Sequence, residues 1–182
     1  MSYNVPNVLT ELAGVEAELE EKGWDQPDYL GFIFQAEDGE SSVFAKSIPS
    51  GVHPVKFLAA IDQMPLHPLI MIAASAPAPL IGVALFTEGW GLKIDSEEEL
   101  HEWERRAAAG ERIENLTDKR IECRMITALL LDDTLIGGNR DRGGELELST
   151  SLDEGGRQLD RESNIPRALA QLLDGYRKFQ DQ

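Results

Sequence analysis

Cysteine is nearly absent from this 182-residue sequence, and the motifs of several large enzyme classes are missing as well. The single Cys123 has no partner for an internal disulfide, and one thiol is too few for a cysteine-rich zinc module. No segment matches the phosphate-binding G-x-x-x-x-G-K-[ST], the dinucleotide-binding G-x-G-x-x-G, the G-x-S-x-G elbow, H-E-x-x-H or C-x-x-C. These absences leave catalysis open, but they favour a non-enzymatic protein without a cofactor.

Basic residues are also scarce: 17 Lys and Arg stand against 33 Asp and Glu, for a formal net charge of −16 at pH 7. The acidic excess is spread along the chain, because residues 1–60, 61–120 and 121–182 contain ten, eleven and twelve acids against three, six and eight bases. Nucleic acids and anionic lipids are held by Lys and Arg, so we expect the protein to bind neither nucleic acid nor membrane. The spread acidity indicates a soluble surface that resists self-association, or one that presents carboxylates to a basic partner.

No secretory signal or membrane span is expected, and we therefore expect a cytoplasmic protein. Residues 1–4 lack the basic and apolar parts of a signal peptide. Residues 63–87 carry no Asp, Glu, Lys or Arg, but they contain four prolines, each of which costs about 3 kcal/mol inside a helix. The prolines separate two apolar runs, Leu69–Ala74 and Leu80–Phe86, which we predict to be two buried strands, or one strand and one buried helical turn.

Four segments carry helical periodicity or helix-end residues. The first begins after Asn4 or Asn7, either of which can cap it, and ends at Gly23. The others are residues 54–64, residues 97–109 and a segment from about residue 164 to the C-terminus. The helix over residues 97–109 turns mainly Leu100 and Trp103 inward, which predicts a peripheral position.

Strand patterns lie between these helices, at Tyr29–Phe34, Ser42–Lys46, Leu80–Phe86, Lys119–Leu131, Thr134–Ile136 and Glu145–Ser149. The glycine-rich residues 137–144 are expected to form a flexible loop or a bulged edge. The order of elements lacks the regular βαβ alternation of a parallel sheet. We predict a single α+β domain over residues 1–182, with a mainly antiparallel sheet, helices packed on one face and a helix at each end.

Four arginines form the first candidate site. Arg120 and Arg124 lie on the long predicted strand, and Arg140 and Arg142 lie in the glycine-rich segment. Guanidinium groups match carboxylates and other anions in geometry, so the four arginines are candidate ligands for a small anion. The alternative is that they pair with Asp and Glu of the protein itself.

Two groups of acids form candidate metal sites. Glu98 and His101 have the i, i+3 spacing that allows two helix side chains to reach one ion. Asp132 and Asp133, with the later pair Asp153–Glu154, have the paired carboxylates of a Ca²⁺ or Mg²⁺ site or of an acid/base pair. Each group also has a structural explanation, because acids favour the start of a helix and form turns.

Two tryptophans are candidate partner-binding residues. Trp24 and Trp90 flank predicted turns, where an aromatic ring either anchors a loop or forms an interface hot spot. Cys123 alternates with charged neighbours on a strand and is expected to be buried and unreactive. His53 and His67 both precede proline, which predicts extended or turn backbone and a loop role.

The segment Gly23-Trp24-Asp25-Gln26-Pro27 follows an acidic amphipathic helix and precedes an aromatic strand. In this it resembles a family of uncharacterised proteins from actinobacteria and their phages. The resemblance continues through the strand at residues 82–88, the strand and hairpin at 120–133 and the closing apolar helix, whereas residues 90–110 and 137–144 depart from it. It implies a cytoplasmic, acidic α+β protein and assigns no catalytic residue. The fold class is also similar to that of bacterial secretion chaperones, which bind peptide segments as dimers.

These observations favour a non-enzymatic protein-binding or adaptor module, chaperone-like in fold class, with a homodimer as a candidate state. Its expected partner is basic, or adds an extended strand to a sheet edge such as Glu145–Ser149. The rival hypothesis is a metal-assisted hydrolase or small-anion enzyme. That enzyme would use Glu98 with His101 or Asp132 with Asp133, and the arginines would hold the anion.

Overall fold

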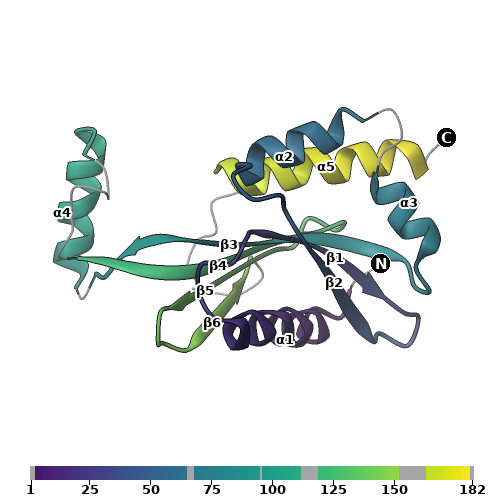
Figure 1. Cartoon of the computed structure of the whole chain (residues 1–182), viewed down its shortest axis with the longest axis horizontal. Coiled ribbons are helices and arrows are strands. Elements are labelled where there is room, and N and C mark those ends of the chain that lie inside the picture. Colours follow the sequence, from purple (N-terminus) through teal and green to yellow (C-terminus); the bar gives the residue numbers. More distant parts are fainter. Residues whose placement is uncertain (1–2, 65–67, 95, 112–118, 152–162, 181–182) are drawn as a thin grey trace.

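A computed structural model of the chain describes residues 3–64, 68–94, 96–111, 119–151 and 163–180. One six-stranded antiparallel sheet, with strand order β2-β1-β3-β4-β5-β6, runs through it (Figure 1). In chain order the elements are α1 (Val5–Lys22), β1 (Tyr29–Gln35), β2 (Ser41–Ser47), α2 (Pro54–Asp62), α3 (Pro68–Ser75), β3 (Leu80–Leu92), α4 (Glu97–Ala108), β4 (Arg120–Leu130), β5 (Leu135–Asp141), β6 (Leu146–Thr150) and α5 (Asn164–Gln180). The α+β class, the antiparallel sheet and the helices at both ends are confirmed.

The helices cover both faces of the sheet, and the prediction that they pack on one face is wrong. In Figure 1, α1 lies on one side of the sheet, and α2 and α5 lie on the other. Two apolar clusters result, and β1 and β3 contribute alternate residues to each. Unbroken apolar runs are typical of strands that are covered on both faces, as Tyr29–Phe34 and Leu80–Phe86 are here.

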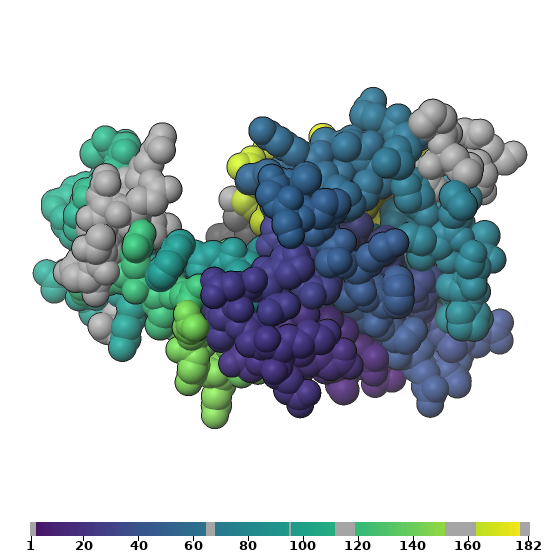
Figure 2. All heavy atoms as spheres, in the orientation of Figure 1, coloured from purple at the N-terminus to yellow at the C-terminus, as the bar shows by residue number. Residues whose placement is uncertain are grey.

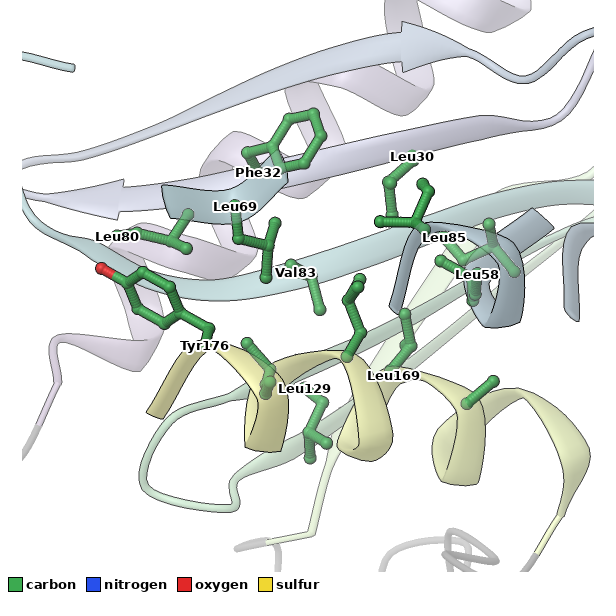
Figure 3. Packing of buried hydrophobic residues seen from close by; sticks show 14 of the residues in the cluster. Leu30, Phe32, Leu58, Leu69, Leu80, Val83, Leu85, Leu129, Leu169 and Tyr176 are labelled. Atoms are coloured by element: carbon green, nitrogen blue, oxygen red, sulfur yellow. The ribbon is translucent and has the colours of Figure 1, made fainter. Parts of the chain in front are cut away.

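The two clusters differ in the helices that build them. On the α1 side, Val8, Leu12 and Leu19 pack against Ile33, Ile81, Ala84, Phe86, Ile126, Ala128, Leu130 and Ile136. On the other side, Figure 3 shows β1, β3 and β4 side chains facing those of α2, α3 and α5, with Leu30, Phe32, Val83, Leu85 and Leu129 meeting Leu58, Leu69, Leu169 and Tyr176. Because both clusters share the central strands, the described residues form one α+β domain.

The apolar run at Leu69–Ala74 is helical, as part of α3, which confirms a helical turn there, but only Leu69 is buried, so the expected burial of the whole turn is wrong. The expectation of a loop or bulged edge over residues 137–144 is wrong for most of that segment. Strand β5 continues to Asp141 in regular register with β4, and only residues 142–144 form a turn. A Cβ on Gly138 would lie 2.6 Å from Leu148 Cδ2, so glycine stands there because of close packing.

Helix α4 is peripheral, as predicted. Strands β3 and β4 pair with each other out to Leu92 and Arg120, and this hairpin carries α4 at the end of the sheet. Ser96 Oγ accepts a hydrogen bond from the Glu99 amide at 3.2 Å and caps the helix. Leu100 is exposed, so the expectation that it turns inward is wrong, and Trp103 is half-buried. Figure 2 shows α4 standing apart from the layer formed by α2 and α5.

No helix among the described residues is long and apolar enough to cross a membrane. His53 precedes α2 in extended backbone and is exposed, as expected for a loop residue, whereas His67 lies outside the described residues.

The close approach of β3 and β4 gives a stability prediction. A Cβ on Gly82 would lie 2.6 Å from the Leu129 carbonyl oxygen, so Gly82→Ala forces the strands apart and should cost about 1 to 3 kcal/mol. The control, Gly14→Ala, makes the same chemical change at an exposed position of α1, where an added Cβ would have no neighbour within 4 Å. It should raise the free energy of unfolding by about 0.5 to 1 kcal/mol. Urea unfolding of both variants tests this, and equal midpoints would contradict the close β3–β4 contact.

Candidate functional site: a buried arginine–carboxylate cluster and an open sheet face

A buried guanidinium joins three carboxylates on the α1 side of the sheet. The Arg124 side chain, on β4, is 1% exposed. Its Nη1 donates to Glu16 Oε1 at 3.0 Å and to Glu20 Oε2 at 3.1 Å, both on α1, and its Nη2 donates to Glu88 Oε1 on β3 at 2.7 Å. Together with Arg140, these residues form what we call the Arg124 cluster. Hydrogen bonds to Glu88 and Glu16 raise the Arg124 pKa, although burial, the largest single influence, acts in the opposite direction.

Glu16 is the most deeply buried member of the cluster, at 0% exposure. Besides Arg124, it accepts from Arg140 Nε on β5 at 2.9 Å, so one carboxylate is shared by two guanidinium groups. Leu12 and Leu19 flank it on the buried stripe of α1, which forces its side chain toward the sheet. Charges removed from water in this way are stable only when they are paired and hydrogen-bonded, as these are.

The G-W-D-Q-P turn closes over the cluster. Gly23 ends α1 at φ 89°, and its carbonyl oxygen accepts from Arg124 Nη2 at 3.0 Å. Glu88 Oε2 accepts from the amides of Asp25 and Gln26 at 2.8 and 3.1 Å. One buried arginine and one carboxylate thus fix the path of the turn that the sequence singles out.

Trp24 belongs to the same arrangement. The guanidinium carbon of Arg124 lies 4.8 Å from the Trp24 ring centroid, and that of Arg142 lies 5.5 Å from it. These cation–π contacts fit the loop-anchoring role that was one of its two interpretations. Trp90 differs, because it is 52% exposed on the β3–β4 hairpin, with the guanidinium carbon of Arg120 4.5 Å from its ring centroid.

The structure brings three of the four candidate arginines together, but their partners are carboxylates of the protein itself. Arg124 and Arg140 share Glu16, and Arg142 forms an ion pair with Glu122. Arg120 stands apart beside Trp90, and its buried Nε is the one buried side-chain polar atom among the described residues that has no hydrogen-bond partner. This arrangement favours internal pairing over an anion site for Arg124, Arg140 and Arg142.

The candidate metal ligands do not converge. His101 Nδ1 lies 3.2 Å from Glu104 Oε2, and the side chain is exposed on α4 together with Glu98. At the other end of β4, Asp132 accepts from the Thr134 amide at 3.1 Å, and Asp133, at φ 66°, accepts from Arg177 at 2.9 Å. No group of three His, Cys, Asp or Glu suited to a metal occurs in the described part of the chain. Asp153 and Glu154 lie outside it.

Among the described residues, the opposite face of the sheet is hollowed beside the first turn of α5. Helix α5 packs on β4 and β5 at Leu129 and Leu135. Met125 and Thr127, which precede Leu129 on β4, are only half-buried. A hollow of about 600 Å³ lies there, lined by Met125, Ile126, Thr127, Gly137, Gly138, Asn139, Glu147, Leu148 and Ser149. A second hollow of about 330 Å³ shares Met125, Thr127 and Gly137 and reaches the first turn of α5. We call the two together the α5-side groove.

Among the described residues, the polar side chains that line the groove are acidic or neutral. Glu147 lines it and is exposed, and Asn139 Nδ2 donates to Asp141 Oδ1 at 2.9 Å. Beside them, burial and then the charge of Asp141 raise the pKa of the Cys123 thiol. Cys123 is therefore a protonated, buried thiol at neutral pH, as the sequence predicted.

Sequence reasoning named Arg124 and Arg140 but missed their partners Glu16, Glu20 and Glu88, and it missed the groove. One signal was available, because an acid at Glu16 on a stripe with Leu12 and Leu19 requires a buried cation. Glu88 gave no such signal, since its partners lie 36 and more than 60 residues away along the chain. The groove was hidden by the expectation of a loop where β5 runs.

No model of a known protein family, no curated protein and no solved structure matches the chain, so functional inference rests on the geometry described above.

The shared carboxylate gives a prediction for the Arg124 cluster. Glu16→Gln leaves the buried Arg124 and the half-buried Arg140 short of a charge partner and should lower the free energy of unfolding by about 3 to 5 kcal/mol. Glu18→Gln, the same change on the exposed side of α1, should stay within about 0.5 kcal/mol of the parent. Urea unfolding measures both, and an equally small effect of Glu16→Gln would contradict the buried charge.

A pH-dependent prediction comes from Asp28, which lies in a hollow of about 340 Å³ beside the G-W-D-Q-P turn. Burial raises its pKa above the ordinary 3.8, and the charge of Glu88 adds to the rise. The folded state therefore binds the carboxyl proton of Asp28 more tightly than the unfolded state does. The contribution of Asp28 to the free energy of unfolding is largest below pH 3.8 and falls as the pH rises through the raised pKa.

Asp28→Asn removes that penalty and should raise the melting temperature at pH 7, with the difference vanishing below the ordinary aspartate pKa. Thermal melts between about pH 3 and pH 7, with exposed Asp38→Asn as the control, test this linkage. A variant that melts lower than the parent at pH 7 would contradict it.

Proposed function

We propose that this chain is a non-enzymatic, cytoplasmic protein-binding module that receives a basic, extended segment of a partner protein along β6 and the α5-side groove. The observation that carries the proposal is the α5-side groove over β4, β5 and β6, which borders the edge strand β6 among the described residues. Among the described residues β6 pairs only with β5, so strand addition would take place on its outer side.

The lining suits a peptide. Met125 is a flexible apolar surface, Gly137 leaves the strand backbone uncovered, and Asn139 and Ser149 offer hydrogen-bonding groups. Glu147 and Ser149 lie on the groove side of β6. Every second side chain of an added strand would point to the same side and lie next to them. Main-chain bonding would provide affinity, and the groove would provide selection among side chains.

Charge selects the kind of partner. Glu147 is exposed on the groove side, Asp141 is nearby, and the net charge of −16 attracts a positively charged segment from a distance. The arginines that would favour an acidic partner are engaged instead: Arg124, Arg140 and Arg142 all pair with internal carboxylates. The rival metal-assisted enzyme has no comparable support, because its candidate ligands lie at opposite ends of β4.

Defined peptides test the proposal. The probes are two labelled peptides of about ten residues, one alternating Val with Lys and Thr, the other with Glu in place of Lys. We expect the basic peptide to bind the parent protein and the acidic one not to bind, with affinity that falls between about 0.05 M and 0.3 M NaCl. Fluorescence anisotropy gives the dissociation constants.

Matched charge reversals locate the site. Glu147→Lys should weaken binding of the basic peptide by about tenfold, whereas Glu18→Lys on α1, with the same net charge, should have little effect. Thr127 is half-buried on β4 and lines the groove, so Thr127→Arg would fill the groove and should also weaken binding. Equal losses for Glu147→Lys and Glu18→Lys, or no binding of the basic peptide by the parent, would overturn the proposal.

A further inference from the structure

Strand β2 forms the other edge of the sheet. Among the described residues β2 pairs only with β1, in an unbroken register from Ser41 to Ser47. Natural edge strands are usually blunted by proline, bulges or several charges. Strand β2 has no proline and no bulge, and its sequence, SSVFAKS, carries Lys46 as its single charge in a chain of net charge −16.

The hydrogen-bonding pattern shows which residues of β2 point outward. The Ile48 amide donates to the Asp28 carbonyl at 2.7 Å, and the Ala36 amide donates to the Glu40 carbonyl at 2.8 Å. In antiparallel strands hydrogen-bonded pairs alternate, so the even-numbered residues of β2 bond to β1. The backbone groups of the odd-numbered residues, Ser41, Val43, Ala45 and Ser47, therefore face outward.

We propose that two copies of this chain associate edge to edge through β2, antiparallel, with the two-fold axis at Phe44. In this register Val43 bonds to Ala45 of the partner subunit and Ser41 bonds to Ser47 of the partner subunit. These are the residues whose backbone groups face outward, so every inter-subunit hydrogen bond uses a group that β1 leaves free. The interface is isologous, since the same seven residues supply both sides.

The side chains match in the same register. Phe44 is 60% exposed, and its ring stacks on Phe32 of β1 with centroids 6.4 Å apart. Across the two-fold axis it meets Phe44 of the partner subunit, which extends the aromatic row and covers the exposed ring. Lys46 faces Ser42 of the partner subunit, so no like charges stand opposite each other.

This association is separate from the proposed peptide site, which lies at the β6 edge, and its salt dependence has the opposite sign. Two copies of a strongly acidic chain repel each other, and the β2 contact is made by backbone, aromatic and serine groups. Added salt screens the repulsion and should strengthen dimerisation, whereas it should weaken binding of the basic peptide. The dimer and the peptide site can therefore be tested separately, and failure of one proposal does not decide the other.

Sedimentation velocity of the full chain over about 1 to 200 µM, at low and high salt, tests the dimer. We expect a monomer–dimer equilibrium that shifts toward dimer with salt. Phe44→Lys should abolish the dimer, and Met71→Lys, at a comparably exposed apolar residue of α3, should leave it intact. Ala45→Pro should also abolish it without unfolding the chain, because this proline removes an outward amide that β1 does not use. Circular dichroism checks the fold of each variant.

Cross-linking tests the register. Phe44→Cys places two thiols about 4.5 Å apart by Cα and should give a disulfide-linked dimer on mild oxidation. Ser42→Cys places them at least about 13 Å apart and should not. A monomer at every concentration and salt, a dimer that survives Phe44→Lys, or cross-linking of Ser42→Cys in place of Phe44→Cys would overturn the proposal.

Discussion

The structure depends on the burial of one carboxylate between two guanidinium groups. Glu16 lies at zero exposure on α1 and holds Arg124 of β4 and Arg140 of β5, residues 108 and 124 positions away along the chain. Glu88 extends the same network to β3 and to the turn after α1. Such a cluster contributes more to specificity than to raw stability, since a wrong placement of α1 would leave unpaired charges away from water. It therefore fixes where α1 crosses the sheet, and with it the G-W-D-Q-P turn.

This constraint separates the two faces of the sheet into different roles. The α1 face is closed by apolar packing and by internal charge pairs, so its arginines are engaged with Glu16, Glu88 and Glu122. The opposite face is closed by α2 and α5 over its central strands and, among the described residues, is hollowed at Met125 and Thr127. The two edges also differ, since β6 carries Glu147 and borders a groove, whereas β2 is nearly neutral and presents Phe44. An acidic edge suits a basic partner, and a neutral, self-complementary edge suits a second copy.

The sequence predicted local structure well and long-range pairing poorly. Asn4, Gly23, Ser96 and Pro54 mark helix ends through contacts within a few residues, and these ends are where the structure has them. The roles of Arg124 and Glu88 depend on strands that meet only after folding, so no local pattern identified their partners. The unbroken apolar runs of β1 and β3 did hold the information that helices cover both faces. Glycines at 137 and 138 indicated a loop by composition, but both lie in strand β5, and Gly138 serves close strand packing.

The central claim is that the buried arginines are held by the protein's own carboxylates, and nitrogen-15 NMR of arginine side chains tests it most directly. Arg124 Nε donates to Glu88 at 3.2 Å and Arg140 Nε donates to Glu16 at 2.9 Å, so both Nε–H protons should exchange slowly with solvent. The exposed Arg105 provides a rapidly exchanging reference in the same spectrum. Two protected Nε–H signals, assigned to Arg124 and Arg140 by substitution, are the expected result. Exchange of both as fast as that of Arg105 would contradict the account.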